Sequence, residues 1–152
     1  MLSFCEWLQQ TPISISIRES VWVFPILDAM HCVGIVLVAG TIVVVDLRLL
    51  GFGMRRESVS SVTAQVLPWT FFGFAFMFVT GSLLAWAEPI KLYRSVFFPW
   101  KLLFLALAGL NALLFRYTTL TPVRARLAAA VSIVCWISVI AAGRAIGYEL
   151  SR

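Results

Sequence analysis

The chain contains a single histidine, and its position beside an acid makes it the clearest candidate for chemistry. His31 lies at the start of a long apolar run and follows Asp28 by three residues. Residues three apart share one face of a helix, so the two side chains are predicted to be neighbours. A neutral imidazole offers one donor and one acceptor nitrogen, and it is the commonest side-chain ligand of metals. His31 is therefore a candidate metal ligand, and Asp28 is a candidate for orienting its ring.

Four apolar segments must position these residues. The 152 residues are 61% hydrophobic and only 12% charged, whereas soluble domains have about 25% charged residues. A helix of about 20 apolar residues crosses a bilayer, and its backbone groups pair within the segment. The sequence predicts an all-α, integral membrane, antiparallel four-helix bundle that forms a single domain over residues 1–152. The expected spans are residues 21–50, 62–87, 96–118 and 127–148.

Short segments rich in glycine, proline and charge separate the spans: GFGMRRESVSS, EPIKLYRS and TPVRAR. Such short connections predict that sequential helices pack as antiparallel neighbours. Pro68 and Trp69 are expected to open the second span, with Trp69 at the membrane interface. Asp46 and Arg48, at the end of the first span, are interpreted as structural. Each is expected to pair elsewhere, for example with the loop MRRES.

Residues 1–20 differ from the rest of the chain, because they carry polar residues and lack the basic start of a signal peptide. Two interpretations stay open: a short helix on the membrane surface, with Phe4, Trp7 and Leu8 on one face, or a disordered tail.

The net charge of +5 fits a bilayer that contains anionic lipid. The sequence shows no basic helix with a face for reading bases, so nucleic acid is not an expected partner. The expected partner is the lipid bilayer, with a homo-oligomer or a larger membrane complex left open. Lysine and arginine divide almost evenly between the two sides, so our expectation that both termini lie outside rests on a small bias.

The order of the spans predicts that four ionisable side chains lie at one depth. Asp28 and His31 belong to the first half of the first span. Two crossings later, Lys101 begins the third span on the same side, and Arg144 ends the fourth span there. Ionisable groups inside a bilayer are functional candidates by default. We expect these four side chains to point inward and to form a pocket for an anionic, partly apolar ligand or for a proton relay.

Each of these residues also has a structural alternative. Lys101 and Arg144 are near helix ends, where long basic side chains extend to the headgroups. Asp28 is then a neutralising partner, and His31 donates a hydrogen bond to a neighbouring helix. These alternatives describe a protein without a cofactor.

Sulfur ligands contribute little to the metal hypothesis. Met30 and Cys32 flank His31, but successive helix positions point about 100° apart, so the three side chains do not converge on one ion. Met77 is a conceivable soft axial ligand, although the small residues around it, Gly73 and Gly81, are more typical of helix packing.

Five features of the sequence recur together: His31 with its glycine-spaced apolar run, VDLRLLG, TGSLL, FPWKLLFLALAGLNALLF, and a tryptophan followed by GRAIGY. Over residues 12–148 this combination resembles an uncharacterised bacterial family of four-helix membrane proteins, the domain of unknown function 6644 type. The resemblance implies a location in the bacterial inner (plasma) membrane.

More loosely, a histidine in the first helix and a lysine starting the third resemble the HemJ-type protoporphyrinogen oxidases and the copper-resistance D membrane proteins. The HemJ resemblance implies haem b on His31, with Lys101 and Arg144 facing propionates and Asp28 behind the ring. The HemJ run Tyr-Leu-Pro-Arg is VDLRLL here, and the chain has no second histidine. Two functions follow: haem b binding in electron transfer or porphyrin chemistry, or a structural subunit or small proton-coupled transporter without a cofactor.

Overall fold

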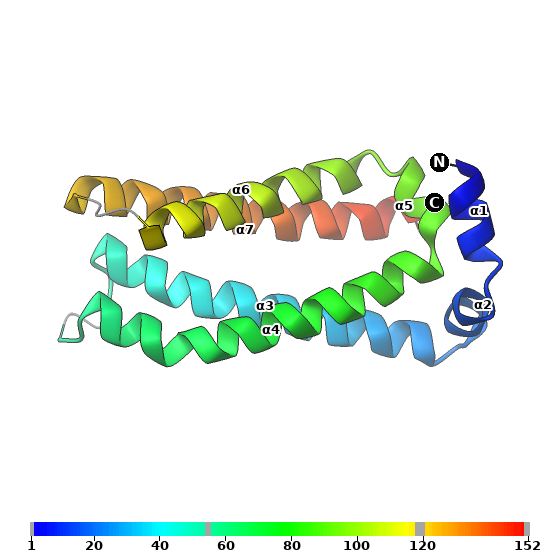
Figure 1. The fold of residues 1–152 in the computed structure, drawn as a ribbon, viewed down its shortest axis with the longest axis horizontal. Helices are drawn as coiled ribbons and strands as arrows, with labels where there is room; N and C mark the ends of the chain where they lie inside the picture. Colours follow the sequence, from blue (N-terminus) through cyan, green and yellow to red (C-terminus); the bar gives the residue numbers. More distant parts are fainter. Residues whose placement is uncertain (1, 54–55, 118–120, 151–152) are drawn as a thin grey trace.

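All the regular structure in the described residues is helical. The computed structural model describes residues 2–53, 56–117 and 121–150. Four long helices run side by side, and both ends of the chain lie at the same end of this bundle (Figure 1). The helices in chain order are α1 (Leu2–Gln9), α2 (Pro12–Glu19), α3 (Val23–Leu50), α4 (Val59–Ala87), α5 (Pro89–Arg94), α6 (Phe97–Tyr117) and α7 (Pro122–Leu150).

The four long helices of the described residues, α3, α4, α6 and α7, are each long and apolar enough to cross a membrane. Large apolar side chains also cover the outside of the bundle, for instance Phe71, Phe72 and Phe78, which are all more than 60% exposed. An outer surface of this kind is stable in lipid and costly in water. The protein is therefore a membrane protein with an all-α bundle, as the sequence predicts.

The helix ends differ from the predicted spans by a few residues. Helix α4 begins at Val59, because the Ser58 hydroxyl caps it by accepting a hydrogen bond from the Ser61 amide at 3.1 Å. The expectation that Pro68 opens this span is wrong, since Pro68 lies inside α4. Helix α3 ends as predicted, at Gly51, whose φ of 90° suits a residue without a side chain. The predicted end of the third span, residue 118, lies outside the described residues.

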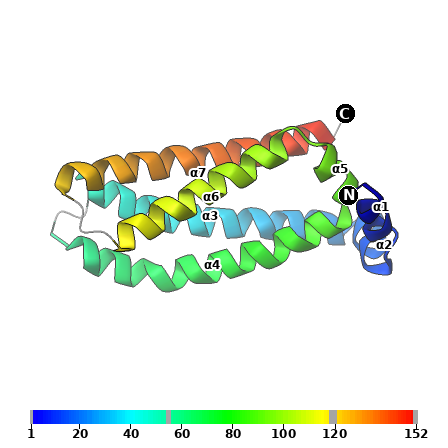
Figure 2. The same ribbon diagram turned by 45° about the horizontal axis from the view of Figure 1, so that its top comes forward.

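The long helices form two pairs, α3 with α4 and α6 with α7, and α3 also packs against α7 (Figures 1 and 2). Along the described residues α4 and α6 make no extensive contact, so the expectation that all sequential spans pack together is wrong for this pair. The reason is the predicted loop EPIKLYRS, in which α5 forms and leads the chain toward the α7 side (Figure 2). The Glu149 carboxylate of α7 then accepts hydrogen bonds from the Ser95 hydroxyl and the Val96 amide, which fixes the start of α6.

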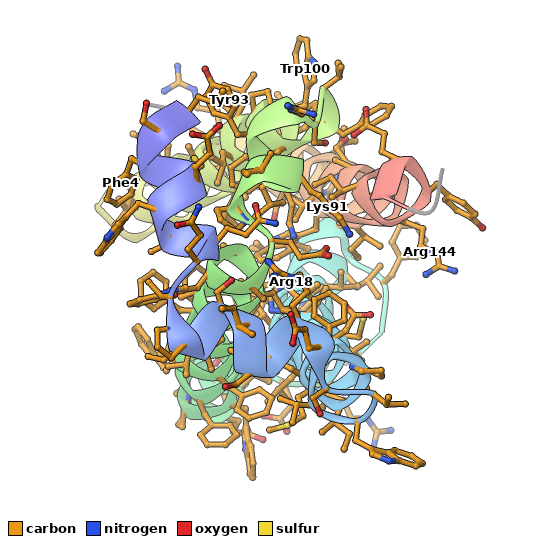
Figure 3. The ribbon with its side chains drawn as sticks, turned by 90° about the vertical axis from the view of Figure 1, so that its right-hand side faces the viewer. Phe4, Arg18, Lys91, Tyr93, Trp100 and Arg144 are labelled. Carbon is orange, nitrogen blue, oxygen red and sulfur yellow. The ribbon has the colours of Figure 1, made fainter. Side chains whose placement is uncertain are left out.

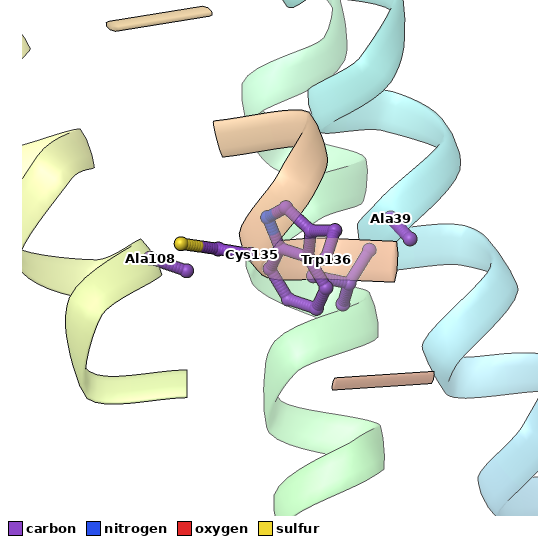
Figure 4. Close-up of a cluster of buried hydrophobic side chains, with 5 residues drawn as sticks. Ala39, Ala108, Cys135 and Trp136 are labelled. Atoms are coloured by element: carbon purple, nitrogen blue, oxygen red, sulfur yellow. The ribbon is translucent and has the colours of Figure 1, made fainter. Parts of the chain in front are cut away.

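A small apolar core lies where α3, α6 and α7 meet. Trp136 of α7 is 4% exposed and packs with Val38 and Ala39 of α3 and Ala108 of α6 (Figure 4). The neighbouring Cys135 points toward Ala108. Small partners leave room for one large indole, which holds the two helix pairs together.

Glycines bring α3 and α4 close together. A Cβ atom added to Gly34 would lie 3.2 Å from the Cβ atom of Met77, and one added to Gly73 would lie 3.0 Å from Val38 Cγ2. Both distances are shorter than ordinary carbon contacts, so a side chain at either position requires its neighbours to move by a few tenths of an ångström. The interpretation of this α4 face as a packing surface is confirmed, and Met77 is buried within it.

The N-terminal residues form helices rather than a disordered tail. Helices α1 and α2 lie crosswise over the end of the bundle (Figures 1 and 3). The Ser14 hydroxyl donates a buried hydrogen bond to the Ala87 carbonyl at 3.1 Å, and Trp86 Nε1 donates to the Thr11 hydroxyl at 2.9 Å. On the outer side the rings of Phe4 and Trp7 stack with centroids 5.8 Å apart, and both are exposed.

Candidate functional site

The imidazole of His31 is held between α3 and α4. Its Nδ1 atom lies 3.1 Å from the Thr80 hydroxyl of α4. That hydroxyl donates its single proton within its own helix, to the Phe76 carbonyl at 2.8 Å with Met77 as a second acceptor. The hydroxyl therefore accepts from Nδ1. We assign the proton of the neutral ring to Nδ1, so Nε2 carries the free lone pair.

Glycine 81 makes room for this ring. A Cβ atom added to Gly81 would lie 2.8 Å from His31 Cε1 and 3.3 Å from Nδ1. The half-buried imidazole thus rests directly on the backbone of α4. The sequence TGSLL supplies both the hydroxyl that orients the ring and the glycine on which it lies.

Lys101 reaches toward the same region from α6. Its side chain is half-buried, and its ammonium lies against α7, 3.6 Å from where a Cβ atom of Gly143 would stand. Lys101 of α6 and Asp28 of α3 both lie within electrostatic range of the imidazole.

Two of the four predicted pocket residues do not point inward. Arg144 is exposed, and its guanidinium lies 5.2 Å from the centre of the Tyr148 ring, on the outside of the bundle (Figure 3). The inward expectation is wrong for Arg144 because α7 buries Ala142 and Ile146, which places residue 144 on the opposite face. Asp28 is also exposed, so it acts on the site only through its charge.

Of the two partners that the sequence leaves open for the ring, the structure shows the neighbouring helix: Thr80 of α4 holds Nδ1, and Asp28 does not. Met30 and Cys32 are both exposed while His31 turns toward α4, so these three side chains diverge as their spacing predicts. The sequence alone does not identify Thr80 as the partner of His31. The position of Thr80 relative to α3 depends on how the glycines let α3 and α4 pack together.

The comparisons with known proteins give a family and no function. A family model described as "Family of unknown function (DUF6644)" matches residues 17–149. The chain belongs to this family. No curated relative and no solved structure matches the chain. The matched residues include α3, α4, α6 and all but the last residue of α7, with His31 and Lys101, and they leave α1 and most of α2 outside. The loose resemblance to HemJ-type oxidases and copper-resistance D proteins stays a prediction.

The other end of the bundle, also within the residues matched to the DUF6644 family, has a polar contact between α3 and α7. Asp46 of α3 is 6% exposed, and Ser132 of α7, which is also 6% exposed, is the polar side chain beside its carboxylate. Its Oδ2 atom is buried without a hydrogen-bond partner in the described residues. Arg48 instead pairs with the loop, as predicted, through hydrogen bonds of 2.8 and 2.6 Å to the Glu57 carbonyl.

This contact predicts opposite effects for two substitutions. We expect Ser132→Ala to destabilise the bundle by about 1–3 kcal/mol, because the buried carboxylate of Asp46 loses the polar side chain beside it. Asp46→Asn removes the cost of burying a charge, so it is expected to preserve or increase stability. The thermal unfolding midpoint in detergent measures both effects. Ser138→Ala is the matched control, because Ser138 bonds only the Val134 carbonyl of its own helix, at 2.8 Å. Equal shifts for Ser132→Ala and Ser138→Ala would show that the contact between α3 and α7 is not stabilising.

Proposed function

We propose that this protein binds haem b in the inner (plasma) membrane of a bacterium, that His31 Nε2 would hold its iron, and that the protein takes part in electron transfer or porphyrin chemistry. The observation that supports this proposal is the hydrogen bond between His31 Nδ1 and Thr80. A histidine that ligates a metal almost always donates its other ring N–H to a fixed acceptor. Such a partner leaves Nε2 unprotonated, which is the state that iron needs.

Haem fits the donor set better than a bare ion does. Within residues 2–53, 56–117 and 121–150, no group of three or more His, Cys, Asp or Glu side chains is placed to hold a metal. A porphyrin supplies four nitrogen ligands itself, so a single imidazole completes the coordination that globins and peroxidases use. Bound haem would supply a redox-active iron. Lys101, half-buried and near His31, is the cation for a propionate, and Arg144 is too far outward for that role.

A structural function without a cofactor is the second candidate. The same hydrogen bond from His31 to Thr80 joins α3 to α4, and interhelical bonds of this kind stabilise membrane bundles by about 0.6 kcal/mol on average. In this alternative the imidazole is a tie between two helices. A proton-coupled transporter is less well supported, because Arg144 and Asp28 of the expected polar pocket are exposed.

The absorption spectrum of the intact protein tests the proposal. The full chain is expressed with ample haem, extracted in a mild detergent and purified. We expect a Soret band that copurifies with the protein at about one haem per chain, since one axial histidine serves each. A protein that is folded by circular dichroism and has no Soret band would rule out haem binding and leave the structural function.

A further inference from the structure

A cavity of about 330 Å³, open to the outside, lies at the end of the bundle between α1, α2 and α5. It is separate from His31 and from the proposed haem site. Its polar lining comes from Glu6 and Gln9 of α1, from Gln10 directly after α1, and from Arg18 and Glu19 of α2. The side chains of Glu6, Gln10 and Glu19 are exposed at its mouth, and Ile15 and Ile90 supply the apolar lining. Figure 3 looks onto this end of the molecule, with Arg18 between α2 and α5 in the view.

The polar groups around this cavity have unused hydrogen-bonding capacity. Gln9 Oε1 is buried and has no donor among the described residues. Arg18 is held only at long range: its Nη1 atom is 3.5 Å from the Gln9 carbonyl, and its Nη2 atom is 3.9 Å from Glu19 Oε1. Both distances are at the outer limit for such contacts, so the guanidinium has donors to spare. The lining therefore has room for a hydrogen-bond donor at Gln9 and an acceptor at Arg18.

The charged side chains of the lining indicate which chemical group of a ligand would face Gln9 and which would face Arg18. Glu6 and Glu19 are carboxylates, and Arg18 is the cation of the lining. Two negative charges and one positive charge suit a ligand that carries a positive group beside a negative one. A quaternary ammonium has no N–H to give to Gln9, whereas a primary ammonium has three.

The position of the cavity brings it level with lipid headgroups. Helix α3 has 28 residues and is about 42 Å long at 1.5 Å per residue, which exceeds the hydrocarbon thickness of about 30 Å. The ends of the bundle therefore lie among the headgroups. At this end the crosswise α1 exposes Phe4 and Trp7, and aromatic side chains of this kind are enriched at the membrane interface.

We propose that the cavity between α1, α2 and α5 binds a phosphoethanolamine group. The primary ammonium donates to Gln9 Oε1 and lies between the carboxylates of Glu6 and Glu19, and the phosphate accepts from Arg18. The group belongs either to an ethanolamine phospholipid of the surrounding bilayer or to a soluble phosphoethanolamine. The proposal does not depend on haem, and α1, which supplies Glu6 and Gln9, lies outside the matched residues 17–149.

Competition between lipids tests the proposal. The full chain is reconstituted in nanodiscs with equal amounts of phosphatidylethanolamine, phosphatidylcholine and phosphatidylglycerol, and native mass spectrometry then counts the lipids that stay bound. We expect retention of phosphatidylethanolamine to exceed that of phosphatidylcholine several-fold. The double variant Glu6→Gln, Glu19→Gln is expected to remove this preference. Glu57→Gln, at the other end of the bundle, is the matched control and is expected to keep it.

Two further experiments distinguish the phospholipid from soluble phosphoethanolamine and control for misfolding. Millimolar phosphoethanolamine in the buffer displaces the lipid if the soluble compound is also a ligand, and has no effect if the acyl chains are needed. Gln9→Leu is a second variant that leaves both carboxylates in place, and it is expected to weaken retention while circular dichroism stays unchanged. Equal retention of phosphatidylethanolamine and phosphatidylcholine would overturn the proposal. So would a preference for phosphatidylglycerol, or a preference for phosphatidylethanolamine that survives in the folded double variant.

Discussion

Replacing His31 with alanine is expected to abolish the Soret band of the haem-loaded protein while the protein still inserts into the membrane. The imidazole is the one axial ligand that the site offers, so its loss leaves the iron without a protein bond. Insertion is unaffected, because removing a polar side chain does not hinder a spanning helix. The spectrum of the purified variant, normalised to protein, measures the first effect, and extraction from washed membranes measures the second.

Three further substitutions make this result specific. Thr80→Val removes the acceptor for Nδ1 and is expected to lower haem occupancy and to change the position or width of the band, because the ring loses its fixed tautomer. Lys101→Met is expected to lower occupancy less, since a propionate contact is one of several. Met30→Leu is the matched control in the same turn, with an exposed side chain, and should retain the band. If His31→Ala keeps the full band, the ligand is another residue and the haem site proposed here is wrong.

Replacing Gly34 with leucine is expected to have the largest effect on stability. A Cβ atom at this position already meets Met77 and Phe76 at 3.2 Å, and the Met77 Cα atom, which is backbone, at 3.3 Å. Overpacking of this kind typically costs about 1–3 kcal/mol, and here the side chain extends well beyond Cβ, so the cost lies at or above the upper end. We expect the variant to lose most of its monodisperse peak in size-exclusion chromatography, and the remainder to unfold at a lower temperature.

Gly40→Leu provides the matched control on the same helix. A Cβ atom at Gly40 meets nothing within 4 Å, so the added side chain extends into lipid. This variant is expected to behave like the wild type or to gain slightly in helix stability. Equal behaviour of the two variants would contradict the close packing of α3 against α4.

The spans were predictable because a single physical requirement determines them. A helix in lipid must be apolar over about 20 residues, and the sequence satisfies this requirement four times with short breaks between. The structure of the connecting segments was less predictable. EPIKLYRS carries a proline and three charges, yet Pro89 is the first residue of α5, where a missing amide proton costs nothing.

The candidate site was predictable only in part, for a reason of geometry. Topology places His31, Lys101 and Arg144 at one depth, but depth does not determine the direction in which a side chain points. Arg144 faces outward because the buried residues of α7 lie on the other side of the helix. Each spanning helix carries apolar residues on all its faces. The one-sided hydrophobic pattern that marks the inner face of a helix in a soluble protein is therefore absent.

The register of α3 against α4 was hidden for a related reason. Glycines set this register, and the sequence offers several of them in both segments. Only the observed pairing, with Gly34 against Met77 and His31 over Gly81, brings Thr80 to the imidazole.

During biosynthesis, α6 enters the membrane before the residue that fixes its first turn has been made. The hydrogen bonds from Ser95 and Val96 go to Glu149, more than fifty residues later in the chain. Helices α3 and α4 are neighbours in sequence and pair through their own glycines, so the contacts between these two helices form early, and those of α3 with α7 come later. In the α6 and α7 hairpin, Asn111 bonds the Ala128 carbonyl near the turn, and the contact of Glu149 with the start of α6 forms last. A truncation just before Glu149 should therefore leave the first hairpin assembled and the second without a fixed start.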